Sequence, residues 1–185
     1  MDSRAQGKAI TMKIEGLEYP YELKLYSPND PDFTEHWRIK YPYNDSGKDV
    51  IAATAMGHLI LVRKGNKPIY TGEILTDQLE FPLSYLKWLL GVISRFQLKP
   101  NKGGYPPGTF SDELQMDEEN WLGVRRGQNF GLGGLFGYGL ENSRRHSYID
   151  NDFEQEFFIT DDYLFEMGLM DALIKIEKDY TDGKL

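Results

Sequence analysis

Apolar and polar residues alternate through much of the first third of the chain, which predicts β-strands there. Residues 10–16 (ITMKIEG), 19–26 (YPYELKLY) and 36–43 (HWRIKYPY) show partial period-two patterns, and turn-forming residues follow each of them. Residues 58–75 predict a hairpin whose turn covers residues 64–67, around a Gly-Asn pair. We expect these strands to form one antiparallel sheet.

The hydrophobic period changes from that of a strand to that of a helix at about residue 77. Asp77 and Glu80 have the spacing of a capping box, and apolar residues then recur at helical intervals. The pattern predicts a helix over about residues 77–98 that is apolar nearly all round, as is typical of a helix buried between layers. The residues expected in the core are Leu86, Leu90 and Ile93.

A second helix is predicted over about residues 161–180, near the end of the chain. Its expected apolar face consists of Phe165, Leu169, Ala172, Leu173 and Ile176. The order of strands, helix, strands and helix predicts an α+β fold, a mainly antiparallel sheet with two principal helices packed on it. We expect residues 1–11 to be a flexible N-terminus and residues 12–185 to form a single domain.

The glycine-rich stretch GQNFGLGGLFGYGLENSRRH, residues 127–146, does not match a phosphate-binding loop. A dinucleotide fingerprint that starts from Gly131 and Gly133 would need glycine where Phe136 stands, and no helix start follows. Period two instead predicts strand over residues 128–140. The side chains expected to be buried are those of Phe130, Leu132, Phe136 and Tyr138.

The glycines of this stretch would share the opposite face of that strand. Glycine weakens a strand, so a face of glycines indicates a close neighbour, a bulge or a bend. We expect a curved strand under a tightly packed helix. The alternative is a floor of glycines for a flat ligand.

Composition and charge restrict the classes of function. The chain has no cysteine, which excludes disulfides, cysteine zinc sites and a thiol nucleophile, and makes the cytoplasm the expected compartment. No uninterrupted apolar run is long enough for a membrane span, so we expect a soluble protein without membrane partners. The formal net charge of -8 disfavours nucleic acid and favours basic proteins or cations as partners.

Catalytic and cofactor motifs are missing from the sequence. The three histidines, His36, His58 and His146, do not have the spacing of zinc ligands on one helix, and no nucleophile-elbow serine is present. Neither a cofactor nor a metal is expected. Two arginine pairs, Arg125-Arg126 and Arg144-Arg145, could meet in a hairpin as a small anion site, or could be ordinary surface charges or partners of nearby carboxylates.

Acidic residues form the most distinctive pattern in the chain. Within YIDNDFEQEFF an extended backbone places four carboxylates on one face, those of Asp150, Asp152, Glu154 and Glu156. A calcium loop is excluded because its required glycine would be Gln155. The row could be a solvated face, the ligands of one divalent metal, or a docking surface for a basic protein.

A second acidic segment precedes the glycine run. It contains Asp112, Glu113, Asp117, Glu118 and Glu119 and could lie near the first. Trp121 and Tyr148 are adjacent to the two acidic segments and are candidate aromatic anchors for a partner, with the core as the alternative location.

Three classes of function are compatible with these features. The first is an acidic protein-binding or inhibitory protein that docks on a basic partner, similar in general character to toxin-neutralising immunity proteins. The second is a carboxylate-metal-dependent hydrolase that uses the acidic strand. The third is a structural accessory protein without a discrete site. The absence of a catalytic motif favours the first, and we expect a protein that is not an enzyme.

Overall fold

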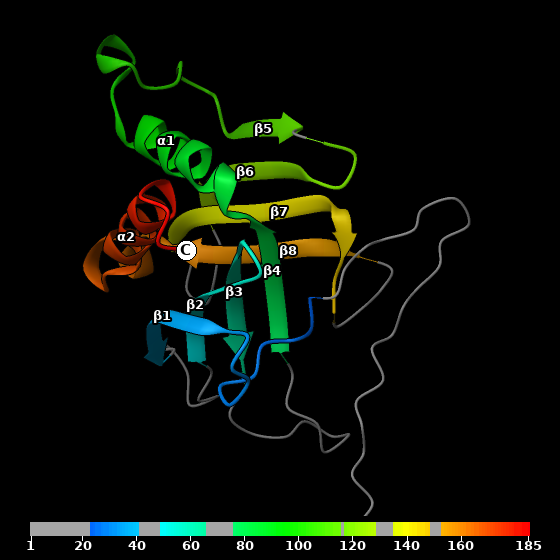
Figure 1. The fold of residues 1–185 in the computed structure, drawn as a ribbon. Coiled ribbons are helices and arrows are strands. Elements are labelled where there is room, and N and C mark those ends of the chain that lie inside the picture. The colour runs from blue at the N-terminus through cyan, green and yellow to red at the C-terminus, as the bar shows by residue number, and fades with distance from the viewer. Residues whose placement is uncertain (1–22, 41–48, 66–75, 116, 129–134, 149–152) are drawn as a thin grey trace, which may run out of the picture.

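The computed structural model describes residues 23–40, 49–65, 76–115, 117–128, 135–148 and 153–185. Within this part of the chain, two four-stranded antiparallel sheets and two principal helices form the fold (Figure 1). The expected α+β class is therefore confirmed. The flexible N-terminus predicted for residues 1–11, the strand at 10–16 and the first half of the strand at 19–26 lie outside the described residues. The described half, residues 23–26, is not strand, so that part of the prediction is wrong.

The first sheet is an antiparallel meander, as predicted for this part of the chain. Its strands follow one another in space in the order β1-β2-β3-β4. Their bounds are Thr34–Lys40 for β1, Asp49–Ala55 for β2, His58–Lys64 for β3 and Thr76–Pro82 for β4. Strand β3 pairs with β4, whereas the second strand of the hairpin predicted over residues 58–75 falls in residues 66–75, outside the described residues.

The second sheet has the strand order β5-β6-β7-β8. Its strands are β5 (Ser111–Gln115), β6 (Trp121–Gln128), β7 (Phe136–His146) and β8 (Glu154–Thr160). They run across the direction of β3 and β4 in Figure 1, and β4 lies against β7 and β8. The expectation of one sheet from the first strands holds, but the later strands form a sheet of their own.

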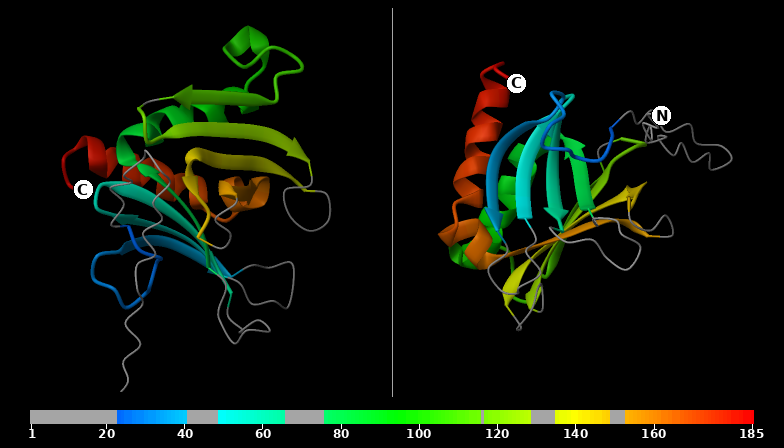
Figure 2. Two further views of the ribbon diagram at one scale, coloured as in Figure 1. Left: turned by 90° about the vertical axis from the view of Figure 1, so that its right-hand side faces the viewer. Right: turned by 90° about the horizontal axis from the view of Figure 1, so that it is seen from below.

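Two helices cover the sheets from the same side of the molecule (Figures 1 and 2). Helix α1 (Leu86–Gln97) packs on β6, and helix α2 (Leu169–Thr181) packs on β1 and β2. Both helices and both sheets contribute to one buried apolar cluster. None of the helices in the described part of the chain is long and apolar enough to cross a membrane.

Strand β2 was not predicted, and burial on both of its faces explains why. Val50 and Ala52 face the main core, whereas Ile51 and Ala53 face a second apolar cluster that includes Tyr26. A strand covered on both sides shows a continuous apolar run in place of alternation. The period-two signal is therefore missing where the sheet is most buried.

The predicted start of the first helix is wrong. Residues 76–82 form strand β4, and a short 3-10 turn, Leu83–Tyr85, then leads into α1. Asp77 and Glu80 are therefore not a helix cap. Leu79 lies opposite Leu61 of β3, so pairing within the sheet overrides the local helical pattern.

Most of the expected core of the two helices is confirmed. Leu86 and Ile93 are fully buried, but Leu90 is only partly buried because Leu89 occupies the inward position. The predicted helix over 161–180 is interrupted: a π-helical turn, Asp162–Glu166, ends before Gly168, whose φ is 83°. The interruption turns Phe165 outward, where it is 45% exposed.

The remaining predicted face of the second helix is confirmed apart from Ala172. Leu169, Leu173 and Ile176 are buried, whereas Ala172 is only partly buried. The helix therefore presents the predicted apolar stripe from Leu169 onward.

The glycine-rich stretch contributes to a hairpin of β6 and β7. Tyr138 is buried, but Phe136, at the start of β7, is 50% exposed, so its predicted burial is wrong. Phe130 and Leu132 lie outside the described residues. Residues 136–140 and Gln128 are strand, as predicted.

The close neighbour of the glycines is a strand and not a helix. Tyr138 points toward α1, where its hydroxyl approaches the carbonyl oxygen of Ile93, so Gly137 and its face point away from the helix. A Cβ atom at Gly137 would overlap the carbonyl oxygen of Ile159 and lie 2.9 Å from Cα of Thr160. The expectation of a tight helix over the glycines is wrong, whereas that of a close backbone approach is confirmed.

Candidate functional site

The outward side of the second sheet carries a row of glutamates that crosses its strands. In the antiparallel register, Glu113 of β5 lies opposite Gly123 of β6, Gly123 opposite Glu141 of β7, and Glu141 opposite Glu156 of β8. Residues directly opposite one another share a face of the sheet. Together with Glu154, these three glutamates form what we call the acidic face.

The predicted alternation of the acidic strand holds where the structure describes it. In β8, Glu154 is exposed and Glu156 is partly exposed, whereas Gln155 and Phe157 between and beyond them are buried. Asp150 and Asp152 lie outside the described residues, so their place relative to this face stays a prediction. Glu113 belongs to the second acidic segment, which could lie near the first, and strand pairing places it in the same row as Glu156. Sequence reasoning missed Glu141, because only strand pairing brings it beside Glu156.

One arginine lies within the acidic face. Arg125 of β6 places its Nε atom 3.5 Å from Oε2 of Glu141, and its guanidinium also forms an ion pair with Glu156. Gly123 makes room for this arrangement, because a Cβ atom there would lie 3.1 Å from Cγ of Glu141. Arg125 thus offsets part of the repulsion between two glutamates that stand directly opposite each other.

Asp117, Glu118 and Glu119 of the second acidic segment stand in the turn between β5 and β6. Asp117 accepts hydrogen bonds from the Tyr85 hydroxyl, from the backbone N–H of Glu119 at 2.8 Å and from the Asn120 amide. Burial opposes ionisation of Asp117, but these hydrogen bonds outweigh it and lower its pKa below 3.8. Asp117 therefore shapes the turn, and Glu118 and Glu119 are exposed on it.

The two candidate aromatic anchors occupy different environments. Trp121 is half-buried on the same side of β6 as Gly123, and the Arg144 guanidinium lies 5.7 Å from the centre of its ring. The Tyr148 hydroxyl donates toward the Leu23 carbonyl oxygen at 2.9 Å and lies 3.1 Å from Oε2 of Glu80. Trp121 is thus part of the outward side, whereas the hydroxyl of Tyr148 is engaged inside the protein.

A buried polar network, which no local sequence pattern indicated, joins the two sheets. At its centre, Nη1 of Arg145 lies 2.6 Å from Oε1 of Glu80, and both side chains are 2% exposed. Gln78 donates to the other carboxylate oxygen of Glu80 at 3.0 Å, and Arg145 also approaches His58. The sequence suggested a helix cap for Glu80 and a surface charge for Arg145.

The backbone of Glu80 is bonded to the second sheet as well. Its N–H donates to Oε1 of Gln155 at 3.0 Å, and its carbonyl oxygen accepts from Nδ2 of Asn142 at 3.2 Å. The side-chain amide of Asn142 also donates a hydrogen bond to the amide oxygen of Asn120. The amide of Asn120 donates in turn to the Asp117 carboxylate. The network therefore extends from the sheet junction to the acidic turn, and its members hold one another in place.

The arginine pairs do not meet as an anion site. Arg125 lies opposite Gly139 and Arg126 opposite Tyr138, while Arg144 and Arg145 are at the other end of β7. Arg126 forms two hydrogen bonds to the Asp161 carboxylate, at 2.8 and 2.7 Å. These arginines are therefore engaged within the protein.

No metal centre is formed by the described residues, in which no group of three or more histidine, aspartate or glutamate side chains is placed to hold an ion. His36 and His58, two of the three histidines, have separate partners, namely the Thr54 hydroxyl and the Met56 carbonyl oxygen. Because Asp150 and Asp152 are not described, a metal site on the acidic strand stays untested.

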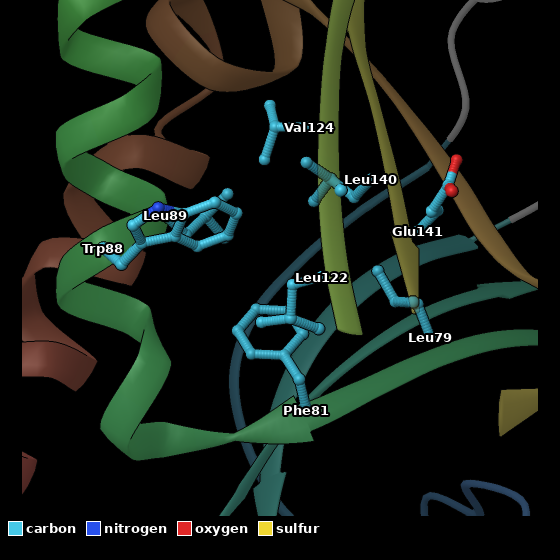
Figure 3. A pocket seen from close by; sticks show the side chains of 9 residues that line it. Leu79, Phe81, Trp88, Leu89, Leu122, Val124, Leu140 and Glu141 are labelled. Carbon is cyan, nitrogen blue, oxygen red and sulfur yellow. The ribbon is translucent and has the colours of Figure 1, made fainter. Parts of the chain in front are cut away.

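An apolar pocket lies between α1 and the second sheet (Figure 3). It is lined by Leu79, Phe81, Trp88, Leu89, Leu122, Gly123, Val124, Leu140 and Glu141. Most of these side chains belong to the buried core, and Glu141, the one charged residue of the lining, points away from α1 in Figure 3. A ligand site usually adds several converging polar groups to an apolar lining, which this pocket does not have.

Comparison with known proteins does not place the chain in a family. No family model matches it, and no curated protein is similar to it.

Proposed function

We propose that this is a binding protein of the inhibitor type, which docks a basic protein partner on its acidic face and acts in the cytoplasm. Toxin-neutralising immunity proteins have this general character. The observation that carries the proposal is the row of Glu113, Glu141 and Glu156, which brings carboxylates from three strands together on the outward side of a sheet.

The charge balance of this face favours a cationic partner. Four glutamates stand on it among the described residues, and Arg125 neutralises only part of their charge. Like charges directly opposite each other, such as Glu141 and Glu156, destabilise a sheet. A basic partner would relieve that repulsion, and its electrostatic attraction would raise the rate of association.

Trp121 supplies an apolar element beside the charges. It is only half-buried, and its ring is accompanied by Arg144. Interfaces commonly combine an aromatic anchor with a charged rim, because the anchor slows dissociation while the charges steer the encounter. The turn with Glu118 and Glu119 directly precedes β6 and extends the negative surface toward Trp121.

The test is a quantitative affinity purification from cells of the source organism. The tagged full-length protein is compared with the triple variant Glu113→Gln, Glu141→Gln and Glu156→Gln. The matched control removes three charges from the region of α2, through Glu166→Gln, Asp171→Asn and Glu177→Gln. We expect a basic protein to be recovered with the unchanged chain and the control, and to be lost with the triple variant.

Association kinetics of the recovered partner then test whether the charges of the acidic face raise the rate of binding. The association rate should fall steeply as salt is raised, and the triple variant should lower that rate and weaken its salt dependence. A partner whose binding ignores both ionic strength and the triple variant contradicts docking on this face.

A further inference from the structure

His58 occupies a constrained position at the junction of the two sheets. It is the first residue of β3 and follows the tight turn at Met56 and Gly57, whose φ angles are 49° and 77°. The carbonyl oxygen of Gly57 accepts a hydrogen bond from the backbone N–H of Leu83 at 2.8 Å, which fastens the turn to the segment before α1. His58 itself is half-buried, so solvent protons can reach its ring.

The contacts of the ring define its protonation state. Nε2 of His58 lies 3.3 Å from Nη2 of Arg145, and Nδ1 lies 3.0 Å from the carbonyl oxygen of Met56. A guanidinium only donates and a carbonyl oxygen only accepts, so Nε2 is the acceptor and Nδ1 carries the proton. This arrangement is compatible with the neutral imidazole alone.

The charged groups around His58 come from three other segments. They are Arg145 of β7, Glu80 of β4 and Glu119 of the turn between β5 and β6. Burial and Arg145 disfavour the charged ring, whereas the Met56 carbonyl oxygen and the two glutamates favour it. The net result is a pKa of His58 below its ordinary value of 6.5, with burial as the largest cause.

We propose that His58 is an acid-sensitive latch on the buried Arg145–Glu80 pair: protonation of Nε2 removes the acceptor for Arg145 and loosens the junction between the two sheets. A proton on Nε2 would set an imidazolium against a guanidinium at hydrogen-bonding distance. Arg145 would then have to move, and its ion pair with Glu80 is one of the contacts that join β7 to β4, beside the hydrogen bond from Asn142 to the Glu80 carbonyl oxygen.

The sign of the pH dependence follows from the lowered pKa. Between the folded pKa and 6.5 the unfolded chain binds more protons at His58 than the folded chain does. The contribution of neutral His58 to stability is therefore complete above about pH 6.5 and is lost as the pH falls through the folded pKa.

The direct test is an NMR titration of the full-length unmodified protein from pH 8 to pH 5. We expect the ring resonance of His58 and the Nε–H resonance of Arg145 to shift with one common midpoint below 6.5. A His58 midpoint at or above 6.5, or an Arg145 resonance that does not follow His58, overturns the proposal.

Thermal unfolding of two variants provides an independent test. Between pH 7.5 and pH 5 the Tm of the unmodified protein should fall by about 2 to 4 °C more than that of His58→Gln, which cannot be protonated. The control is His36→Gln, since burial also lowers the pKa of His36, whose ring is hydrogen-bonded to the Thr54 hydroxyl. This control should leave the response of Arg145 to pH unchanged, and a lost response contradicts the assignment to His58.

Discussion

Arg145 and Glu80 form a fully buried ion pair, with 2.6 Å between Nη1 and Oε1, although 65 residues separate them in the chain. Glu80 belongs to the last strand of the first sheet, and Arg145 to a bulged part of β7 in the second. The carboxylate also receives a hydrogen bond from Gln78 at 3.0 Å, and the Tyr148 hydroxyl lies 3.1 Å from it. A buried charge is tolerated only when it is compensated in this way, so each partner depends on the other.

Removal of one member of this pair should strongly destabilise the protein. Arg145→Met leaves the Glu80 carboxylate buried without its cation, and we expect a loss of about 3 to 5 kcal/mol in the free energy of unfolding. Urea denaturation measures it. The control, Arg125→Met, removes a half-exposed arginine from the acidic face and should cost no more than about 1 kcal/mol. Equal costs for the two variants would contradict the burial of the Arg145–Glu80 pair.

Alanine at Gly137 should destabilise the second sheet. The new Cβ atom would overlap backbone atoms of β8, which cannot move aside as a flexible side chain can. We expect a lower Tm for Gly137→Ala. In α1, by contrast, nothing lies within 4 Å of a Cβ atom at Gly91, and alanine there should stabilise the helix by about 0.5 to 1 kcal/mol. Calorimetry of both variants should give shifts of opposite sign.

Truncation of Leu173 should show where α2 faces the core. Leu173 is fully buried, and Leu173→Ala is expected to cost about 2 to 5 kcal/mol. The next residue, Ile174, is 47% exposed, so Ile174→Ala should change stability by only about 0.5 kcal/mol. Leu90→Ala, at a partly buried site, should fall between these two in chemical denaturation.

The free energy of unfolding should depend on pH through Asp117, in the turn between β5 and β6. Its folded pKa is lowered below 3.8, so its carboxylate contributes stability above about pH 3.8 and loses that contribution as the pH falls through the folded value. Asp117→Asn should therefore be less stable than the unmodified protein at neutral pH, and the difference should shrink in acid. Glu118→Gln removes a charge from the neighbouring exposed position and should not reproduce this behaviour.

The candidate site was only partly predictable from sequence. Alternation within β8 indicated that Glu154 and Glu156 share a face, because side chains alternate across any strand. That Glu113 and Glu141 join them depends on strand register, which brings residues from separate strands into one row. Tyr148 was a candidate anchor because it is adjacent to acidic residues, but its hydroxyl bonds to groups far away in the chain.

The sequence by itself determined the α+β class and the inward stripe of Leu169, Leu173 and Ile176 on α2. These features follow from local periodicity, since the residues that face a core recur with the period of their own helix or strand. Only the tertiary structure decided that residues 76–82 are a strand. It also decided that Glu80 meets Arg145, because neither local period nor composition records which distant segment will cover a given face.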